Sequence, residues 1–176
     1  CQLLLDKIQT TYLQHRQDLI DKDPASLLSV IMPAIYEPIL PDSLLIQKNF
    51  EDTMAAKQFI SDHYWDGIKF WDTRLAYTPF FLPKLKKYFK DVVSYKTDTI
   101  IKKMDWMLSY AAASDDMTRL MMEDFVAASI NHTYHWNDSV FIHLFEKHIA
   151  PKKYSWLSES QRQTISEKAY YLMGKM

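Results

Sequence analysis

Glycine is nearly absent from this chain, which contains only Gly67 and Gly174 among 176 residues. The usual share of glycine is about 7%. A β-sheet protein of this length needs many more glycines, because its hairpin turns place residues at positive φ. Apolar residues also recur at intervals of three and four along most of the chain, as they do on the buried face of a helix. These two features predict an all-α fold of about eight helices.

Prolines and capping residues divide the chain into short helices. Asp23–Pro24 and Thr78–Pro79 each predict an N-cap followed by proline at the first helical position. Asp138 is expected to cap the helix that follows it, and Ser158 with Gln161 has the form of a capping box. Helices are predicted near residues 2–21, 24–36, 50–65, 79–93, 97–113, 116–135, 139–149 and 158–173. Their short connections predict stacked antiparallel hairpins, arranged as an orthogonal bundle or a repeat-like array.

Composition excludes several classes of protein. Hydrophobic residues make up 48% and charged residues 24% of the chain, as in an ordinary globular domain. Lys and Arg number 21 against 22 Asp and Glu, so no basic excess predicts a nucleic-acid partner. No apolar run reaches the roughly 18–20 residues of a transmembrane helix. The single cysteine, Cys1, cannot form an internal disulfide; it leaves open a lipid-modified N-terminus or a sequence that begins inside a helix.

Four histidines in the last third of the chain raise the question of a metal site. His132 and His135, three residues apart on the predicted helix over 116–135, could share one face, while His143 and His148 follow. A zinc site requires further ligands, and neither an HExxH nor a CxxC pattern is present. We therefore predict solvated or locally bonded histidines, and no metal site.

Sequence motifs of catalysis are also missing. There is no GxSxG elbow, no glycine-rich phosphate loop before a helix, and no base positioned beside Cys1. The sequence thus predicts no catalytic residue, no cofactor and no enzymatic activity. The lysines at 84, 86, 87 and 90 are expected to form the solvated face of an amphipathic helix.

The stretch HYWDGIKFWDTRLAYTP, residues 63–79, predicts a structural corner. Gly67 permits a positive φ, Trp65 and Phe70 are expected to pack inward, and Asp66 or Asp72 to bond backbone amides or pair with Arg74. A ligand site is the alternative, with Tyr64, Trp65 and Trp71 as an exposed stacking platform. The residues assigned to the structural motif are His63, Trp65, Asp66, Phe70, Asp72, Arg74, Thr78 and Pro79. Trp156, Tyr170 and Tyr171, near the end of the chain, are the candidates for an interface.

The same stretch, continued as HYWDGIKFWDTRLAYTPFFLPKLKKYF, resembles a known pattern: His-[Phe/Tyr]-Trp-Asp-x-[Ile/Val]-x-Phe-x-Asp-x-Arg-Leu-x-x-Thr-Pro. The pattern belongs to an uncharacterised helical domain that precedes the thioredoxin-like domain of bacteroidete TlpA-like thiol–disulfide oxidoreductases. DPASLLSVIM, DSVFIHLFEKHI and AYYLMGKM are similar to further segments of that family, in the same order. Trp71 departs from the pattern, which has a small polar residue there.

This resemblance implies a function. It assigns residues 1–173 to one helical accessory domain and 174–176 to the start of a linker, before a thioredoxin-like domain that carries the Cys-x-x-Cys. The domain would be non-catalytic, located in the periplasm or cell envelope with a lipoprotein anchor as one option, and would position the redox domain or mediate client or self association. Two alternatives stay open: a free-standing helical scaffold that binds a peptide or protein in a groove, and a small-molecule or glycan-binding domain.

Overall fold

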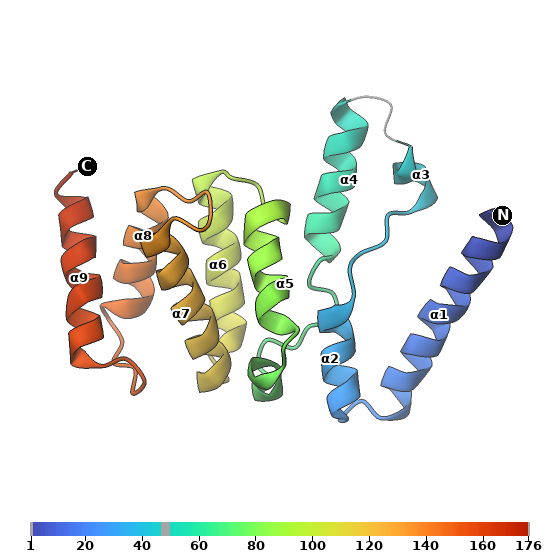
Figure 1. The fold of residues 1–176 in the computed structure, drawn as a ribbon, viewed down its shortest axis with the longest axis horizontal. Coiled ribbons are helices and arrows are strands. Elements are labelled where there is room, and N and C mark those ends of the chain that lie inside the picture. Colours follow the sequence, from blue (N-terminus) through green and yellow to red (C-terminus); the bar gives the residue numbers. More distant parts are fainter. Residues whose placement is uncertain (1, 47–49, 176) are drawn as a thin grey trace. The chain divides into compact units, whose positions relative to one another are not determined.

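The computed structural model describes residues 2–46 and 50–175 of the chain (Figure 1). All the regular elements in these two ranges are helices, nine of them α-helices, which confirms the predicted all-α fold. Contacts between residues divide the chain into two compact units, Cys1–Tyr88 and Phe89–Met176, here called unit 1 and unit 2. The single domain over 1–173 with a linker at 174–176 stays a prediction. In the described part of the chain, no helix combines the length and the apolar character needed to cross a bilayer.

Unit 1 is organised around its second helix. In chain order its elements are α1 (Gln2–Lys22), α2 (Leu27–Ile35), α3 (Asp42–Leu45), α4 (Phe50–His63), the 3-10 helix η1 (Thr73–Tyr77) and α5 (Phe81–Lys87). α2 packs against α1, α5 and η1, while α3 packs against α4 (Figure 1). Val30 and Ala34 of α2 are buried as a result.

Unit 2 is organised around α8. Its α-helices are α6 (Thr97–Ala111), α7 (Asp115–Asn131), α8 (Asp138–Leu144) and α9 (Glu159–Met173). α8 packs against α6, α7 and α9 (Figure 1). Its sequence is apolar on several sides, with Val140, Phe141, Ile142 and Leu144 all buried, as expected for a helix surrounded by others.

Two helices continue as π-helical turns. η2 (Tyr88–Val92) follows α5, and η3 (Phe145–Ile149) follows α8. In η3 the backbone N–H of Ala150 donates to the carbonyl oxygen of Phe145 at 2.8 Å, a bond that spans five residues. Such a turn is wider than an α-helical turn and changes which residues share a face. The helices predicted at 79–93 and 139–149 are therefore each an α-helix followed by a π turn.

Aromatic side chains fill the core of each unit. In unit 1, the ring of Trp65 lies against Tyr64, Phe70, Phe81 and Tyr88, with centroid separations between 5.2 and 6.0 Å. In unit 2, Phe89 and Phe125 meet edge to face at 5.1 Å, and both contact Trp136. Tilted and edge-to-face pairs are the preferred arrangements of such rings. These aromatic residues therefore form core, as large rings do where helices cross, while others such as Trp71, Tyr77 and Trp106 are exposed.

Two predicted helix starts were wrong. α2 begins at Leu27 because Ser26, and not Asp23, is its N-cap: the Ser26 hydroxyl accepts from the N–H of Ser29 at 3.1 Å. Asp23–Pro24 instead forms the turn before it, in which the Ser26 N–H donates to the Asp23 carbonyl. Thr78 is the C-cap of η1, where its N–H and its hydroxyl both donate to the Leu75 carbonyl, so α5 begins at Phe81, two residues later than predicted.

Two further boundaries differ in unit 2. Asn137 is the N-cap of α8, and Asp138 is its first residue. A carboxylate there is stabilised by the positive end of the helix dipole. α7 ends at Asn131, because His132 adopts a left-handed conformation with φ of 52°. His132 and His135 therefore do not share a helical face. The capping box is confirmed: the Ser158 hydroxyl accepts from the Gln161 N–H, and the Gln161 side chain accepts from the Ser158 N–H.

Candidate functional site

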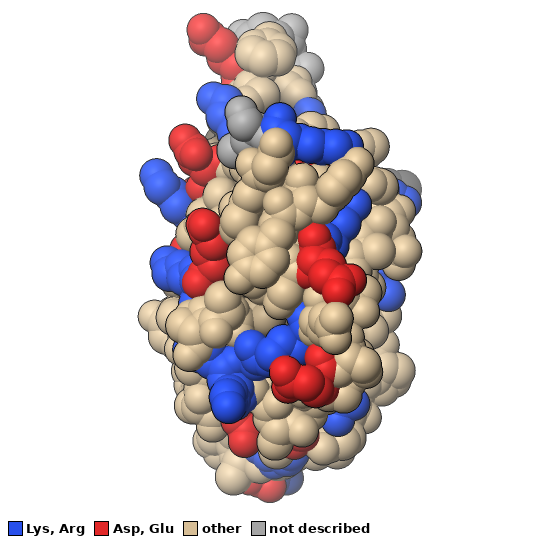
Figure 2. Space-filling model, turned by 90° about the vertical axis from the view of Figure 1, so that its left-hand side faces the viewer, with Lys and Arg blue, Asp and Glu red and all other residues tan. Residues whose placement is uncertain are grey.

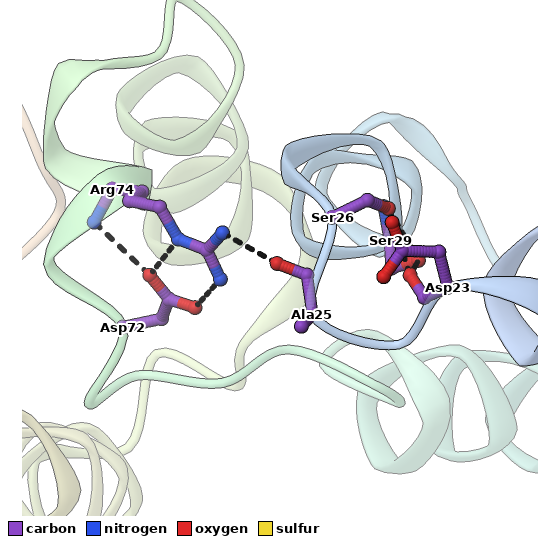
Figure 3. Close-up of polar contacts among 6 residues, drawn as sticks. All are labelled: Asp23, Ala25, Ser26, Ser29, Asp72 and Arg74. Carbon is purple, nitrogen blue, oxygen red and sulfur yellow. Dashed lines mark hydrogen bonds and ion pairs between the residues drawn. The ribbon is translucent and has the colours of Figure 1, made fainter.

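The motif at 63–79 forms a corner held by an ion pair (Figure 3). The Asp72 carboxylate caps η1 by accepting from the Arg74 N–H at 3.1 Å, and it pairs with the guanidinium through Nε at 2.9 Å and Nη2 at 2.7 Å. Arg74 Nη1 donates to the carbonyl oxygen of Ala25 at 2.7 Å. The Arg74 side-chain bonds lower the pKa of Asp72 despite its partial burial. This contact confirms the predicted pairing and ties η1 to the loop between α1 and α2.

The same loop is cross-linked by hydroxyl groups (Figure 3). Ser26 Oγ and Ser29 Oγ both donate to the carbonyl oxygen of Asp23, at 2.8 and 2.5 Å. Ser29 is buried, so these bonds supply the polar partner that a buried hydroxyl requires. The loop whose carbonyl accepts from Arg74 is thus also held by its own hydroxyl bonds.

The rest of the motif is also structural. Trp65 and Phe70 are buried, as predicted, and Gly67 adopts a φ of 76°. A Cβ atom on Gly67 would lie 3.2 Å from Cγ of Pro33, so the glycine also allows α2 to approach closely. His63 and Asp66 pair with each other at 2.7 Å on the surface. Pro79 occupies the turn between η1 and α5.

The stacking platform considered for a ligand does not form. It requires Tyr64, Trp65 and Trp71 to be exposed together, but Tyr64 is 3% and Trp65 7% exposed. Only Trp71 of the three, at 49%, faces solvent. Because Trp65 is buried and Trp71 is exposed, these residues do not offer two adjacent faces to a sugar or an aromatic ligand.

Lys84 does not lie on a solvated face, contrary to prediction. It is 6% exposed, its Nζ donates to the carbonyl oxygen of Tyr36, and it lies 4.4 Å from the centroid of the Tyr64 ring. Burial lowers the pKa of Lys84 to about 8, with Glu37 partly opposing the shift. Tyr36 is the C-cap of α2, so the ammonium group satisfies a carbonyl at that helix end and holds α5 against α2.

An apolar groove of about 480 Å³ lies between α7 and α9 in unit 2. Its apolar lining comes from Met122, Val126 and Ile130 of α7, from Trp156 and Leu157 in the connection that precedes α9, and from Ile165 of α9. The groove forms because α7 and α9 both pack on α8 and leave a channel between themselves. Volumes of roughly 300–1,000 Å³ are typical of binding pockets.

The groove carries little charge. Among its described lining residues Glu123 alone is charged, and Arg119 pairs with its carboxylate at 2.8 Å. On the face of the molecule that carries α9, Lys and Arg are interspersed with Asp and Glu, the pattern of a solvated protein surface (Figure 2). An apolar ligand surface therefore matches the groove better than an ionic one.

The predicted interface residues have two different environments. Trp156 is half-buried, stacks on Tyr154 with centroids 5.0 Å apart, and contributes one wall of the groove. Tyr170 and Tyr171 are 64% and 58% exposed on α9 and are not part of the groove. The structure thus brings Trp156, but neither tyrosine, to the cavity.

A polar cluster in unit 2 joins α6 to α8 and η3. The carboxylate of Asp105 accepts from His143 Nε2 at 3.0 Å, from His148 Nε2 at 2.7 Å and from Lys147 Nζ at 2.8 Å. Burial raises the pKa of Asp105, but these three bonds outweigh it and hold the pKa at about 2. Burial lowers the pKa of His148, partly offset by Asp105.

Sequence reasoning missed this cluster because of its spacing. His143 and His148 are five residues apart, and on a regular α-helix such residues point about 140° away from each other. His148 lies within the π turn η3, whose wider turn brings its ring to the same side as that of His143. Asp105 comes from α6, 38 and 43 residues away in sequence.

No family model, curated protein or solved structure matches this chain. The resemblance to the helical domain of TlpA-like proteins therefore depends on the residues of the 63–79 motif and the three shorter segments alone.

Proposed function

We propose that this chain is a non-catalytic helical interaction domain that binds an amphipathic helix of a protein partner in the groove between α7 and α9. The groove is the observation that supports this function. Its α7 wall extends from Met122 to Asn131, a length of about 14 Å, which accommodates two to three turns of a helix.

The form of the partner follows from the architecture. Strand addition requires an exposed sheet edge, and every regular element in residues 2–46 and 50–175 is helical. Recognition must then proceed through side chains, as when a helix places its apolar face in a groove. The low charge of the lining favours an apolar face, and the half-buried Trp156 offers the kind of aromatic wall that anchors interfaces.

We further propose that this domain accompanies the thioredoxin-like domain of an exported TlpA-like thiol–disulfide oxidoreductase, with the periplasm or cell envelope as its location. The order of the resembling segments along the chain supports this setting. The interaction surface would then present a client protein, or a second copy of the chain, to the redox domain. A reading frame that continues into a thioredoxin-like domain with Cys-x-x-Cys is expected. A stop codon directly after Met176 would contradict this setting but would leave the proposed binding function of the groove unaffected.

The groove itself can be tested with a model peptide. The probe is a 14-residue helix-forming peptide, about four turns long, with leucines on one face; its control has the same composition with the leucines scattered. The methyl NMR signals of Ile130 and Ile165 are expected to change their chemical shifts when the one-faced peptide is added, and not when the control peptide is added. Ala127→Arg, in the exposed part of the groove wall, should abolish these changes. Ala113→Arg, exposed and outside the groove, should leave them unchanged. Equal shifts with both peptides, or none with either, would overturn the proposal.

A further inference from the structure

We propose that Asp105, His143 and His148 bind a divalent transition-metal ion such as Zn²⁺. The ligand atoms are Oδ1 of the carboxylate and Nε2 of each imidazole, and potential ligand atoms of the three residues all lie within 4.8 Å of one another. Two imidazoles and one carboxylate are a common set of protein ligands for zinc and for other first-row metals. This site is separate from the groove and independent of the proposed partner.

The geometry is close to what a metal requires. Oδ1 of Asp105 lies 3.0 Å from His143 Nε2 and 2.7 Å from His148 Nε2. Around a tetrahedral zinc with bonds of about 2.0–2.1 Å, neighbouring ligand atoms are about 3.3 Å apart. The two N···O distances therefore need to lengthen by only about 0.3 and 0.6 Å, and the ion would replace the two protons that now bridge these atoms.

Lys147 orients the carboxylate without occupying its inner oxygen. Its Nζ bonds Oδ2 at 2.8 Å. His143 Nε2 lies 3.0 Å from both Oδ1 and Oδ2, and His148 Nε2 lies 2.7 Å from Oδ1, so Oδ1 is the oxygen that both histidines contact. A hydrogen-bonded partner of this kind orients a metal-binding carboxylate. Lys147 is 54% exposed along its side chain, so it can also swing away at small cost.

Access and rigidity also suit a metal. The side chain of His143 is 27% exposed, which gives an ion a route from solvent, while His148 is buried in unit 2. The π turn that contains His148 holds its ring on the same side as that of His143, and π turns are frequent at functional sites. Three protein ligands leave a fourth position open, as in sites that take up water or a substrate atom. The structure thus supplies, through Asp105, the third ligand that the sequence pattern lacked.

Equilibrium dialysis of the tag-free chain against Zn²⁺, followed by metal analysis, tests the site. One ion per chain is expected for the wild type and for His135→Gln, an exposed histidine of unit 2 outside the cluster. His143→Gln, His148→Gln and Asp105→Asn should each bind at least about tenfold more weakly. Circular dichroism in EDTA establishes that each variant is folded. Equal binding by His143→Gln and the wild type would overturn the proposal.

A second measurement does not depend on substitutions. Co²⁺ added to the wild-type chain should give the intense visible absorption of a four- or five-coordinate ion, and Zn²⁺ should displace it. Zn²⁺ should also raise the melting temperature of the wild type and of His135→Gln, since an ion that binds only the folded state stabilises it. A weak octahedral spectrum, together with an unchanged melting temperature, would overturn the proposal even if every variant failed to fold.

Discussion

Arg74 Nη1 lies 2.7 Å from the carbonyl oxygen of Ala25, which precedes it by 49 residues. Nε and Nη2 of the same guanidinium donate to the carboxylate of Asp72, the N-cap of η1 (Figure 3). One side chain therefore joins the 63–79 corner to the start of α2. Because a bidentate pair of this kind is both directional and charge-assisted, we regard it as the element that fixes the corner.

Substitution of this pair should destabilise the protein. Asp72→Ala removes the cap of η1 and is expected to lower the free energy of unfolding by about 1–2 kcal/mol. Arg74→Ala should lower the melting temperature as well, because it releases the Ala25 carbonyl. Asp66→Ala is the control: Asp66 pairs with the exposed His63, and such surface pairs contribute little. Unchanged melting temperatures in both Asp72→Ala and Arg74→Ala would favour a binding role for the corner.

A side chain at position 67 should destabilise the protein. Its φ of 76° is strained for other residues, and a new Cβ would press on Pro33 at 3.2–3.3 Å. We expect Gly67→Ala to lower the free energy of unfolding by about 1–2 kcal/mol, measured by urea denaturation. Gly174→Ala is the matched control, because Gly174 has a φ of −71° and its nearest contact would be 3.5 Å. Equal stability of the two variants would show that unit 1 relaxes around position 67.

Lys84 should make stability increase with pH. Its pKa is about 8 in the folded chain, against about 10.4 in an unfolded one. Between these values the unfolded chain holds a proton that the folded chain has lost, so the free energy of unfolding rises with pH through this window. The full increase in the free energy of unfolding is about 3 kcal/mol. It is reached above the pKa of the unfolded chain and is lost below the pKa of the folded chain.

Comparison with a variant isolates the contribution of Lys84. The free energy of unfolding of the wild type and of Lys84→Met is measured with denaturant at several pH values between about 7 and 10.5. As pH rises, the value for the wild type should increase relative to that for the variant. Lys86→Met, which alters an exposed lysine of the same helix that is not among the charges shifting the pKa of Lys84, should run parallel to the wild type. A constant difference between wild type and Lys84→Met would mean that Lys84 retains an ordinary pKa.

The capping box should set the stability of α9. Ser158→Ala leaves the N–H of Gln161 without its acceptor and is expected to cost about 1 kcal/mol. Ser155→Ala, in the preceding exposed turn, should have no measurable effect. Hydrogen exchange of the α9 amides is the sensitive readout, because fraying would begin at this end. Identical exchange in the two variants would contradict a structural role for the box.

The helical architecture could be predicted from local information. Scarcity of glycine, apolar spacing and capping residues are properties of neighbours in sequence, and they placed eight helices close to their observed bounds. Ser158 with Gln161 was recognisable because both partners of the box lie within one turn. Trp65 and Phe70 could be assigned to the core because large rings in a helical domain usually pack there.

The corner, the groove and the polar cluster required tertiary structure. Nothing near Arg74 in sequence indicates Ala25, and nothing near His148 indicates Asp105, because each partner comes from a helix or loop 40 or more residues away. Lys84 looked solvated because its neighbours in sequence are lysines, yet α2 covers it and supplies a carbonyl acceptor. Local pattern determines which segments become helices; packing between helices decides which polar groups lose water and which of them meet.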